Sequence, residues 1–261
     1  MKKIKFLARL FLFSLALFGV ITNTASAMEK EALWYIKRNG SCRPVLQAEQ
    51  ELIYNYNGYY IDKKLSDTSE EKRIYLTFDL GYSNENVISI LDTLKECEVP
   101  AAFFILDNIV LKNPDLVMRM KNEGHLICNH TKNHKNLCKM TEEEIKENLS
   151  ALEILCLEKT GCEVAKYFRF PEGRYNERCL KTVDSLGYKT VFWSFAYADW
   201  DNGRQPSPDY AIKKVISNTH NGGVFLFHPT SKTNAAIFRE LIIAWRNLGY
   251  SFGTLDELVA E

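Results

Sequence analysis

Two histidines four residues apart form the first feature of this sequence that could do chemistry. They are His130 and His134, in the stretch NHTKNH. On one turn of a helix this spacing would bring both imidazoles to the same face. There, two ring nitrogens could bind a divalent metal such as zinc. The pair alone is also compatible with surface or capping residues, but its position just after an apolar run favours a metal site.

A lone carboxylate ends the first strongly apolar run. The run IYLTFD stops at Asp79. A carboxylate in such a place can act as a general base that takes a proton from water. It can also simply cap the turn that follows the run. The residue type alone leaves both roles open.

Further polar side chains stand where other apolar runs stop. Arg169 ends AKYFRF, Asp199 and Asp201 follow VFWSFAYA, and His228 ends GGVFLFH. Each has an ordinary explanation when taken alone: a surface cation in a rigid turn, loop carboxylates that accept from backbone amides, and a hydrogen-bonded core histidine. Their common place at the ends of apolar runs indicates a shared site.

The segments that carry these residues alternate between two kinds of periodicity from residue 74 onward. Strands are expected at 74–79, 101–106, 125–128, 165–170, 188–196 and 222–228, and helices at 86–96, 113–124, 141–155 and near 176–186, 208–218 and 234–248. The helix at 141–155 begins with a capping box of Thr141 and Glu144. This alternation predicts an α/β protein whose mostly parallel sheet is either a barrel or doubly wound. In both architectures, chemistry gathers at the carboxyl ends of the strands.

The first 27 residues have the layout of a signal peptide. Cations precede a short apolar run, and ASA ending at Ala27 fits a cleavage site. The run is short for a membrane span, so we expect a secreted protein or one at the outer face of the cytoplasmic membrane. An uncleaved anchor is the alternative. Residues 28–72 are predicted to be an N-terminal extension packed on a main domain at 73–261.

Charge and cysteine content exclude some classes of function. The chain has 33 basic and 33 acidic residues; without its first 27 residues it would carry about four more acids than bases. No basic stripe is present, so nucleic acid is not expected as a partner. The seven cysteines are irregularly spaced and form no C-x2-C pair, which excludes a standard structural zinc site and a compact disulfide framework. One or two disulfides, or free and partly buried thiols, both remain compatible with export.

The order of five motifs, TFDLG, NHTKNH, RFPEG, ADW and LFH, resembles the polysaccharide deacetylases, the NodB-homology domain of carbohydrate esterase family 4. This resemblance covers roughly residues 73–261. NGYYIDKK, VPAAFFIL, WSFAYADWD, QPS and, near the N-terminus, ALWYIKRNG resemble more closely the delta-lactam-biosynthetic de-N-acetylases of bacterial peptidoglycan. The resemblance implies a distorted (β/α) barrel and metal-assisted hydrolysis of the N-acetyl group of an amino sugar.

The resemblance also implies catalytic roles. Asp79 matches the base that takes a proton from the attacking water, and Arg169 matches the residue that holds this base in place. His228 matches the general acid that protonates the departing amine. Asp199 matches the residue that orients and tunes His228, and a neighbouring carboxylate favours the imidazolium form that an acid requires.

The remaining site residues follow from the same matching. His130 and His134 match the ligands of a divalent metal, for which zinc is expected. Trp200 matches a wall of the sugar pocket, and the backbone N–H of Glu172 has the position expected to stabilise the oxyanion. Tyr82 is assigned to substrate binding with them.

The sequence departs from the family pattern at two motifs. The family commonly has Thr-Phe-Asp-Asp, and its second Asp completes a set of two histidines and one carboxylate; Leu80 stands there in this chain. Leucine cannot bind a metal, so two histidines and waters would make a weaker site. The delta-lactam subgroup commonly lacks this second Asp, so Leu80 favours that subgroup. In RFPEG, Phe170 and Glu172 also replace residues that are common in the family.

These features predict an exported, monomeric enzyme that deacetylates N-acetylmuramic acid in peptidoglycan glycan strands. The freed amine can then close onto the lactyl group to give the muramic delta-lactam of spore cortex. One alternative is a deacetylase of N-acetylglucosamine in peptidoglycan or chitin-type glycans. Another is a non-catalytic, glycan-binding relic. Leu80 supports this alternative because it cannot bind a metal, whereas the retained polar residues of the other motifs argue against it.

Overall fold

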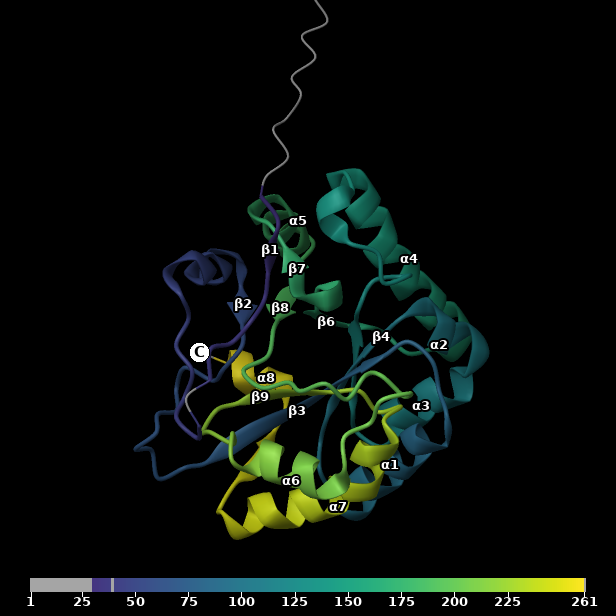
Figure 1. The fold of residues 1–261 in the computed structure, drawn as a ribbon. Helices are drawn as coiled ribbons and strands as arrows, with labels where there is room; N and C mark the ends of the chain where they lie inside the picture. Colours follow the sequence, from purple (N-terminus) through teal and green to yellow (C-terminus); the bar gives the residue numbers. More distant parts are fainter. Residues whose placement is uncertain (1–29, 39, 261) are drawn as a thin grey trace, which may run out of the picture.

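The computed structural model in Figure 1 describes residues 30–38 and 40–260. The predicted signal peptide at 1–27 lies outside these residues. Within them, every helix is either too short or too polar to cross a lipid bilayer.

A curled parallel sheet occupies the centre of the molecule. Its strands are β2 Gly58–Tyr59, β3 Arg73–Leu80, β4 Ala102–Ile105, β5 Leu126–Asn129, β6 Ala165–Phe168, β8 Lys189–Val191, β9 Val224–Phe227 and β10 Ser251–Gly253. They follow the order β10-β3-β4-β5-β6-β8-β2, and β9 pairs with β3. A parallel bridge between Phe195 and Phe225 joins the segment after β8 to β9, so the sheet closes on itself. This confirms the predicted distorted (β/α) barrel.

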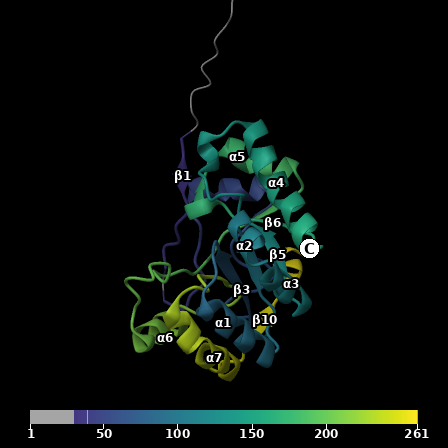
Figure 2. The same cartoon turned by 90° about the vertical axis from the view of Figure 1, so that its right-hand side faces the viewer.

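Helices cover the outside of the sheet, as the two views in Figures 1 and 2 show. They are α1 Glu85–Glu96, α2 Asp107–Lys112, α3 Pro114–Asn122, α4 Glu142–Thr160, α5 Glu177–Ser185, α6 Pro208–Ile216, α7 Lys232–Asn247 and α8 Leu255–Val259. The predicted capping box opens α4: the N–H of Glu144 donates to Thr141 Oγ1 at 3.2 Å, and the N–H of Thr141 donates to Glu144 Oε2 at 2.7 Å. Three 3-10 helices, η1 Ala48–Tyr56, η2 Leu137–Lys139 and η3 Pro171–Gly173, complete the helical elements.

The side chains of β3 alternate between two cores. Leu76, Phe78 and Leu80 belong to the outer hydrophobic cluster, which also contains residues of α1 and α7. Tyr75 belongs instead to the inner cluster. Because successive strand residues point to opposite faces, Asp79 lies on the inner face with Tyr75. Leu80 is therefore a core residue on the helix side of the sheet.

The N-terminal segment is tied to the barrel by pairing and by aromatic packing. Strand β1, Ala32–Leu33, pairs antiparallel with β7, Arg174–Tyr175. Trp34 stacks on Phe192 with ring centroids 4.2 Å apart, and its indole N–H donates to the carbonyl of Trp193. Strand β2 joins the main sheet beside β8. The division at residue 72 remains a prediction.

Short elements account for most differences from the sequence-based expectation. Helices α2 and α8 and strand β10 have six, five and three residues, too few for a periodic pattern to be visible. The strand expected at 188–196 ends at Val191. The residues after it still bond to neighbouring strands, from the N–H of Phe192 to the carbonyl of Tyr59 and through the bridge between Phe195 and Phe225. All seven cysteines lie in the described part of the chain, where none of them forms a disulfide bond and six are buried.

Candidate active site

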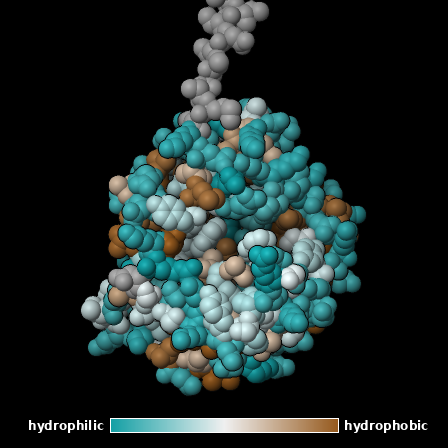
Figure 3. All heavy atoms as spheres, viewed as in Figure 1, coloured by the Kyte–Doolittle hydropathy of each residue, from teal (hydrophilic) through white to brown (hydrophobic). Residues whose placement is uncertain are grey.

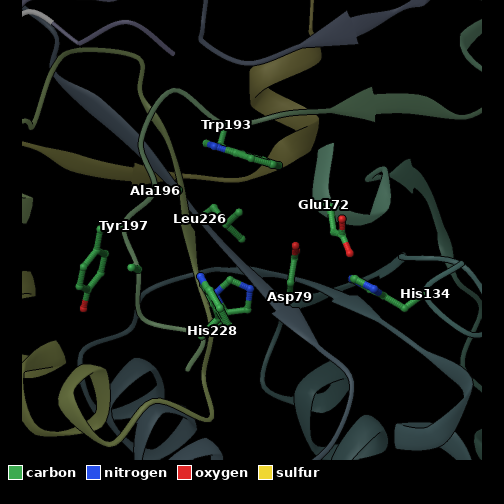
Figure 4. A pocket seen from close by; sticks show the side chains of 10 residues that line it. Asp79, His134, Glu172, Trp193, Ala196, Tyr197, Leu226 and His228 are labelled. Atoms are coloured by element: carbon green, nitrogen blue, oxygen red, sulfur yellow. The ribbon is translucent and has the colours of Figure 1, made fainter. Parts of the chain in front are cut away.

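The polar residues that end the strands gather around one cavity, seen from close by in Figure 4. Its volume is about 610 Å³, and its wall is formed by Asp79, His134, Glu172, Trp193, Ala196, Tyr197, Ala198, Trp200, Leu226 and His228. Figure 3 shows that this face of the molecule is hollowed near its middle, with hydrophilic, intermediate and hydrophobic residues around the hollow. His130, Arg169 and Asp199 do not line the cavity but contact side chains that do.

Asp79 is fixed by a buried ion pair. Arg169 Nη1 lies 2.8 Å from Asp79 Oδ1. The other guanidinium nitrogens donate to the carbonyl of Val191 and to Thr77 Oγ1, both at 2.9 Å, and the group stacks 4.1 Å from the ring centroid of Phe104. Burial alone would raise the pKa of Asp79, but electrostatic interactions with His130, Arg169 and His228 outweigh it and lower this pKa. Asp79 is therefore an ionised carboxylate that faces the cavity.

The two histidines are close together, but the predicted helical turn is wrong. The ring centroids of His130 and His134 are 4.9 Å apart. The chain between them is a loop in which Thr131 and His134 have φ values of 76° and 57°. Asn129 Oδ1 accepts from the N–H of Thr131, and Thr131 Oγ1 accepts from the N–H of His134, at 2.9 and 2.8 Å. These local side-chain bonds replace the helical backbone pattern.

The chemistry of His130 suits a metal ligand. Its Nδ1 lies 2.9 Å from the carbonyl oxygen of Arg169, which can only accept, so Nδ1 carries the proton. Nε2 is then the free nitrogen, and it lies 3.5 Å from Asp79 Oδ2. Burial, the largest effect, lowers the pKa of His130 to about 4 and keeps the ring neutral. A hydrogen bond of this kind on the second nitrogen is typical of metal-binding histidines.

The donor set therefore fits a divalent metal held by His130 and His134, with Asp79 beside them. Within residues 30–38 and 40–260, no three His, Cys, Asp or Glu side chains are grouped so that they could hold an ion together. Leu80 is buried in the outer core and contributes no ligand. In the structure as in the sequence, Leu80 therefore does not supply the metal ligand that the second Asp commonly supplies in the family.

The opposite part of the site is built around His228. Its Nδ1 lies 2.7 Å from Asp199 Oδ1, and its backbone N–H donates to Asp199 Oδ2 at 2.8 Å. Asp199 is fully buried, whereas 28% of the His228 side chain is exposed. Burial alone would lower the pKa of His228, but the charge and hydrogen bond of Asp199, followed by the charge of Asp79, raise it. The imidazolium form is therefore favoured.

Asn234 belongs to this site, although no motif or spacing in the sequence singled it out. Its Nδ2 donates to Asp199 Oδ2 at 2.6 Å and to the carbonyl of His228 at 3.1 Å, and its Oδ1 accepts from the hydroxyl of Tyr197. Gln205, in the stretch QPS, donates to the carbonyl of Asp199 at 2.8 Å. For Gln205, the sequence offered one signal, the resemblance of QPS to the deacetylases. That resemblance did not indicate that Gln205 contacts Asp199.

The three residues assigned to substrate binding lie in different positions. Trp200 lines the cavity and is 63% exposed. Glu172 also lines it, with φ of 54°, and Figure 4 shows its carboxylate directed toward His134. Tyr82 is outside the cavity wall; its hydroxyl accepts from Asn202, close in sequence to Trp200. Trp193, which the sequence did not select, adds a second indole to the wall.

Comparison with known proteins gives consistent matches. The profile of the family "Polysaccharide deacetylase" matches residues 66–191. The peptidoglycan-N-acetylmuramic acid deacetylase PdaA of Bacillus subtilis is 35% identical over 91% of this chain and 89% of its own. The solved structure of that protein, described as a family 4 carbohydrate esterase, gives a TM-score of 0.81 at 34% identity, covering 88% of this chain and 97% of its own. The peptidoglycan-N-acetylglucosamine deacetylase PgdA of Listeria monocytogenes is 33% identical over 73% of this chain and 39% of its own.

Proposed function

Because this chain belongs to the polysaccharide deacetylase family, we propose that it removes the N-acetyl group from N-acetylmuramic acid in peptidoglycan glycan strands. One observation carries the proposal: Asp79 and His228, the base and acid that amide hydrolysis needs, face the same cavity from two neighbouring strand ends (Figure 4). The similarity to PdaA over most of both chains supports the choice of muramic acid.

Asp79 acts as the general base in this proposal. Its lowered pKa keeps it ionised at neutral pH, so it can accept a proton from the water that attacks the acetyl carbonyl. Arg169 is fully buried and is held by the carbonyl of Val191 and by Thr77, so it fixes the direction of the Asp79 carboxylate. We assign Arg169 as a positioning residue.

His228 acts as the general acid. An amine leaves poorly unless it is protonated, and the imidazolium of His228 can supply that proton through Nε2. Asp199 holds Nδ1 at 2.7 Å, which leaves Nε2 toward the substrate and stabilises the charged ring. Asn234 in turn holds Asp199, so the acid is kept in one orientation.

His130 and His134 would hold a divalent metal, and we propose zinc. When bound, such an ion lowers the pKa of a water molecule and polarises a carbonyl oxygen. The hydrogen bond from His130 Nδ1 to the Arg169 carbonyl orients the free Nε2 toward Asp79. The backbone N–H of Glu172 is proposed as the donor to the oxyanion.

The sugar would lie against the aromatic part of the cavity. Trp200 and Trp193 line it and offer flat apolar surfaces. We propose Trp200 as the wall of the sugar pocket and Tyr82 as part of its rim. The freed amine of muramic acid would then close onto the lactyl group to form a delta-lactam. Export through the signal peptide at 1–27, action as a monomer on the cell wall and a role in spore cortex complete the proposal.

A second candidate is deacetylation of N-acetylglucosamine, because PgdA of Listeria monocytogenes is also similar over most of this chain. Purified protein with added zinc would be incubated separately with amidase-treated glycan strands and with chitooligosaccharides, and released acetate would be measured. We expect release from the glycan strands. Release only from the chitooligosaccharides would contradict the proposed function and support the second candidate.

A further inference from the structure

A second cavity adjoins the catalytic one and is lined by cations. Its volume is about 380 Å³, and it shares Tyr197 and Ala198 with the catalytic cavity. The other wall residues are Arg38, Arg204, Gln205, Pro206, Tyr210 and Lys214. Three positive side chains thus surround this cavity, and its described wall contains no carboxylate.

Arg38 is held by a backbone hydrogen bond and by an aromatic ring. It comes from the N-terminal segment and donates through Nη2 to the carbonyl of Ala196 at 2.7 Å. Its guanidinium also lies 4.9 Å from the ring centroid of Phe195. These contacts fix the group beside the chain that forms the wall of the catalytic cavity, and they leave other guanidinium N–H groups available.

The positive charge is not neutralised by the protein. In the described part of the chain, Arg38, Arg204 and Lys214 have no carboxylate within ion-pair distance. A third cavity, on the side of His134, gives the contrast. Its Arg174 is paired with both Glu31 and Glu172, at 2.6 and 2.7 Å. Carboxylates thus line the cavity on the side of His134, whereas the described wall of the second cavity has none.

We infer that Arg38, Arg204 and Lys214 form a subsite that binds the lactyl carboxylate of the glycan strand beside the acetyl group that is removed. Unpaired cations in a concave site attract anions, and guanidinium groups match carboxylates geometrically. Muramic acid carries a carboxylate on its lactyl group, whereas glucosamine carries none. The inference rests on the proposed function and deepens it, because it assigns the discrimination between the two sugars to a named surface.

Arg204 and Lys214 provide the test, because neither lines the catalytic cavity. The variant R204Q/K214Q would be compared with K213Q, which removes an exposed cation from the same helix, α6, but outside the cavity wall. The substrates are amidase-treated glycan strands and the same strands with their carboxylates converted to methylamides. Hydrogen bonds to charged groups predict that the wild-type protein prefers the charged strands by about 10-fold or more in kcat/KM.

We expect R204Q/K214Q to lose this preference through a higher KM, with kcat changed less than about twofold, while K213Q keeps it. A double variant that prefers charged strands as strongly as the wild type would overturn the subsite. So would a wild-type protein that deacetylates both forms equally. Failure of the proposed function is distinct, because mass spectrometry of the digested strands would then show that the muramic acid residues of both forms keep their acetyl groups.

Strands that keep their stem peptides identify the carboxylate. In these strands the lactyl carboxylate is consumed in an amide bond, while the peptides still carry carboxylates of their own. We expect wild-type protein and R204Q/K214Q to process them equally. A persistent advantage of the wild type on these strands would overturn the assignment to the lactyl carboxylate.

Discussion

The catalytic cavity has an acid half, formed by His228, Asp199, Asn234 and Tyr197, and a histidine half, formed by Asp79, Arg169, His130 and His134. In the acid half, the protein alone fixes the imidazole, because Asp199 is buried and accepts from both His228 and Asn234. In the histidine half, Asp79 is fixed in the same way by Arg169, but His134 faces the cavity and contacts the ring of His130.

The two halves therefore differ in how far the protein alone arranges them for catalysis. The acid half has its orientation before any ligand arrives, and Asp199 favours the charged form of His228. The histidine half offers two imidazoles, of which one is kept neutral by burial, the form that a metal needs. We therefore expect changes in the two halves to have different signatures: loss of the base or the metal should remove activity, while loss of acid-half contacts should change its pH dependence.

The largest effect is expected from Asp79→Asn in the histidine half. The amide keeps the shape but cannot take a proton, so acetate release should fall by about 10²- to 10⁴-fold. Glycan binding, measured by calorimetry, should stay close to that of the wild type. If the wild-type protein is itself inert with zinc, cobalt or manganese while still binding glycan, the chain is a binding relic rather than an enzyme.

Metal removal should affect the histidine half alone. A chelator should abolish acetate release, and added zinc should restore it, because His130 and His134 are the proposed ligands. The titration of His228, followed by NMR on the same samples, should change little, since its partner is Asp199. Undiminished activity after exhaustive chelation would contradict the assignment of the two histidines.

Asp199→Asn should move the pH profile rather than only lower it. Asp199 raises the pKa of His228, and the acid form exists below this pKa, so activity is lost as the pH rises through it. Removal of the negative charge lowers the pKa, and the alkaline limb of kcat should move to lower pH. An alkaline limb that stays in place would show that it does not report on His228.

Asn234→Ala should give the smallest effect of the series. It removes one hydrogen bond to the charged Asp199, worth about 1.5 to 3 kcal/mol, and one to the neutral carbonyl of His228, worth about 0.5 to 1.5 kcal/mol. We expect kcat to fall by about 10-fold. The alkaline limb should shift less than it does in Asp199→Asn, because the charge of Asp199 remains. Asn234→Asp is a harsher control, because it places a second carboxylate beside Asp199.

Much of the fold and part of the site were predictable from the sequence because strand ends are visible in it. Asp79, Arg169 and His228 each stand at or directly after the end of an apolar run, and the carboxyl ends of parallel strands meet at one edge of a barrel. The order of the runs therefore predicted which polar residues would lie together, before any contact was known.

The rest depends on contacts that leave no local pattern. Asn234 reaches Asp199 from 35 positions along the chain, from the first turn of a helix where Asn has no special signature. The loop that places His134 depends on two left-handed residues, Thr131 and His134, neither of which is a glycine. The sequence shows that Leu80 replaces a metal ligand of the family. Only the structure shows that its side chain lies on the outer face of the sheet and packs in the outer core.

The proposed function is tested most directly by finding which sugar loses its acetyl group. Amidase-treated glycan strands would be incubated with wild-type protein and zinc, digested to disaccharides and analysed by mass spectrometry, with Asp79→Asn as the blank. We predict that muramic acid residues become lighter by one acetyl group, or appear as the lactam, while glucosamine residues keep theirs. Deacetylated glucosamine beside intact N-acetylmuramic acid would contradict the account.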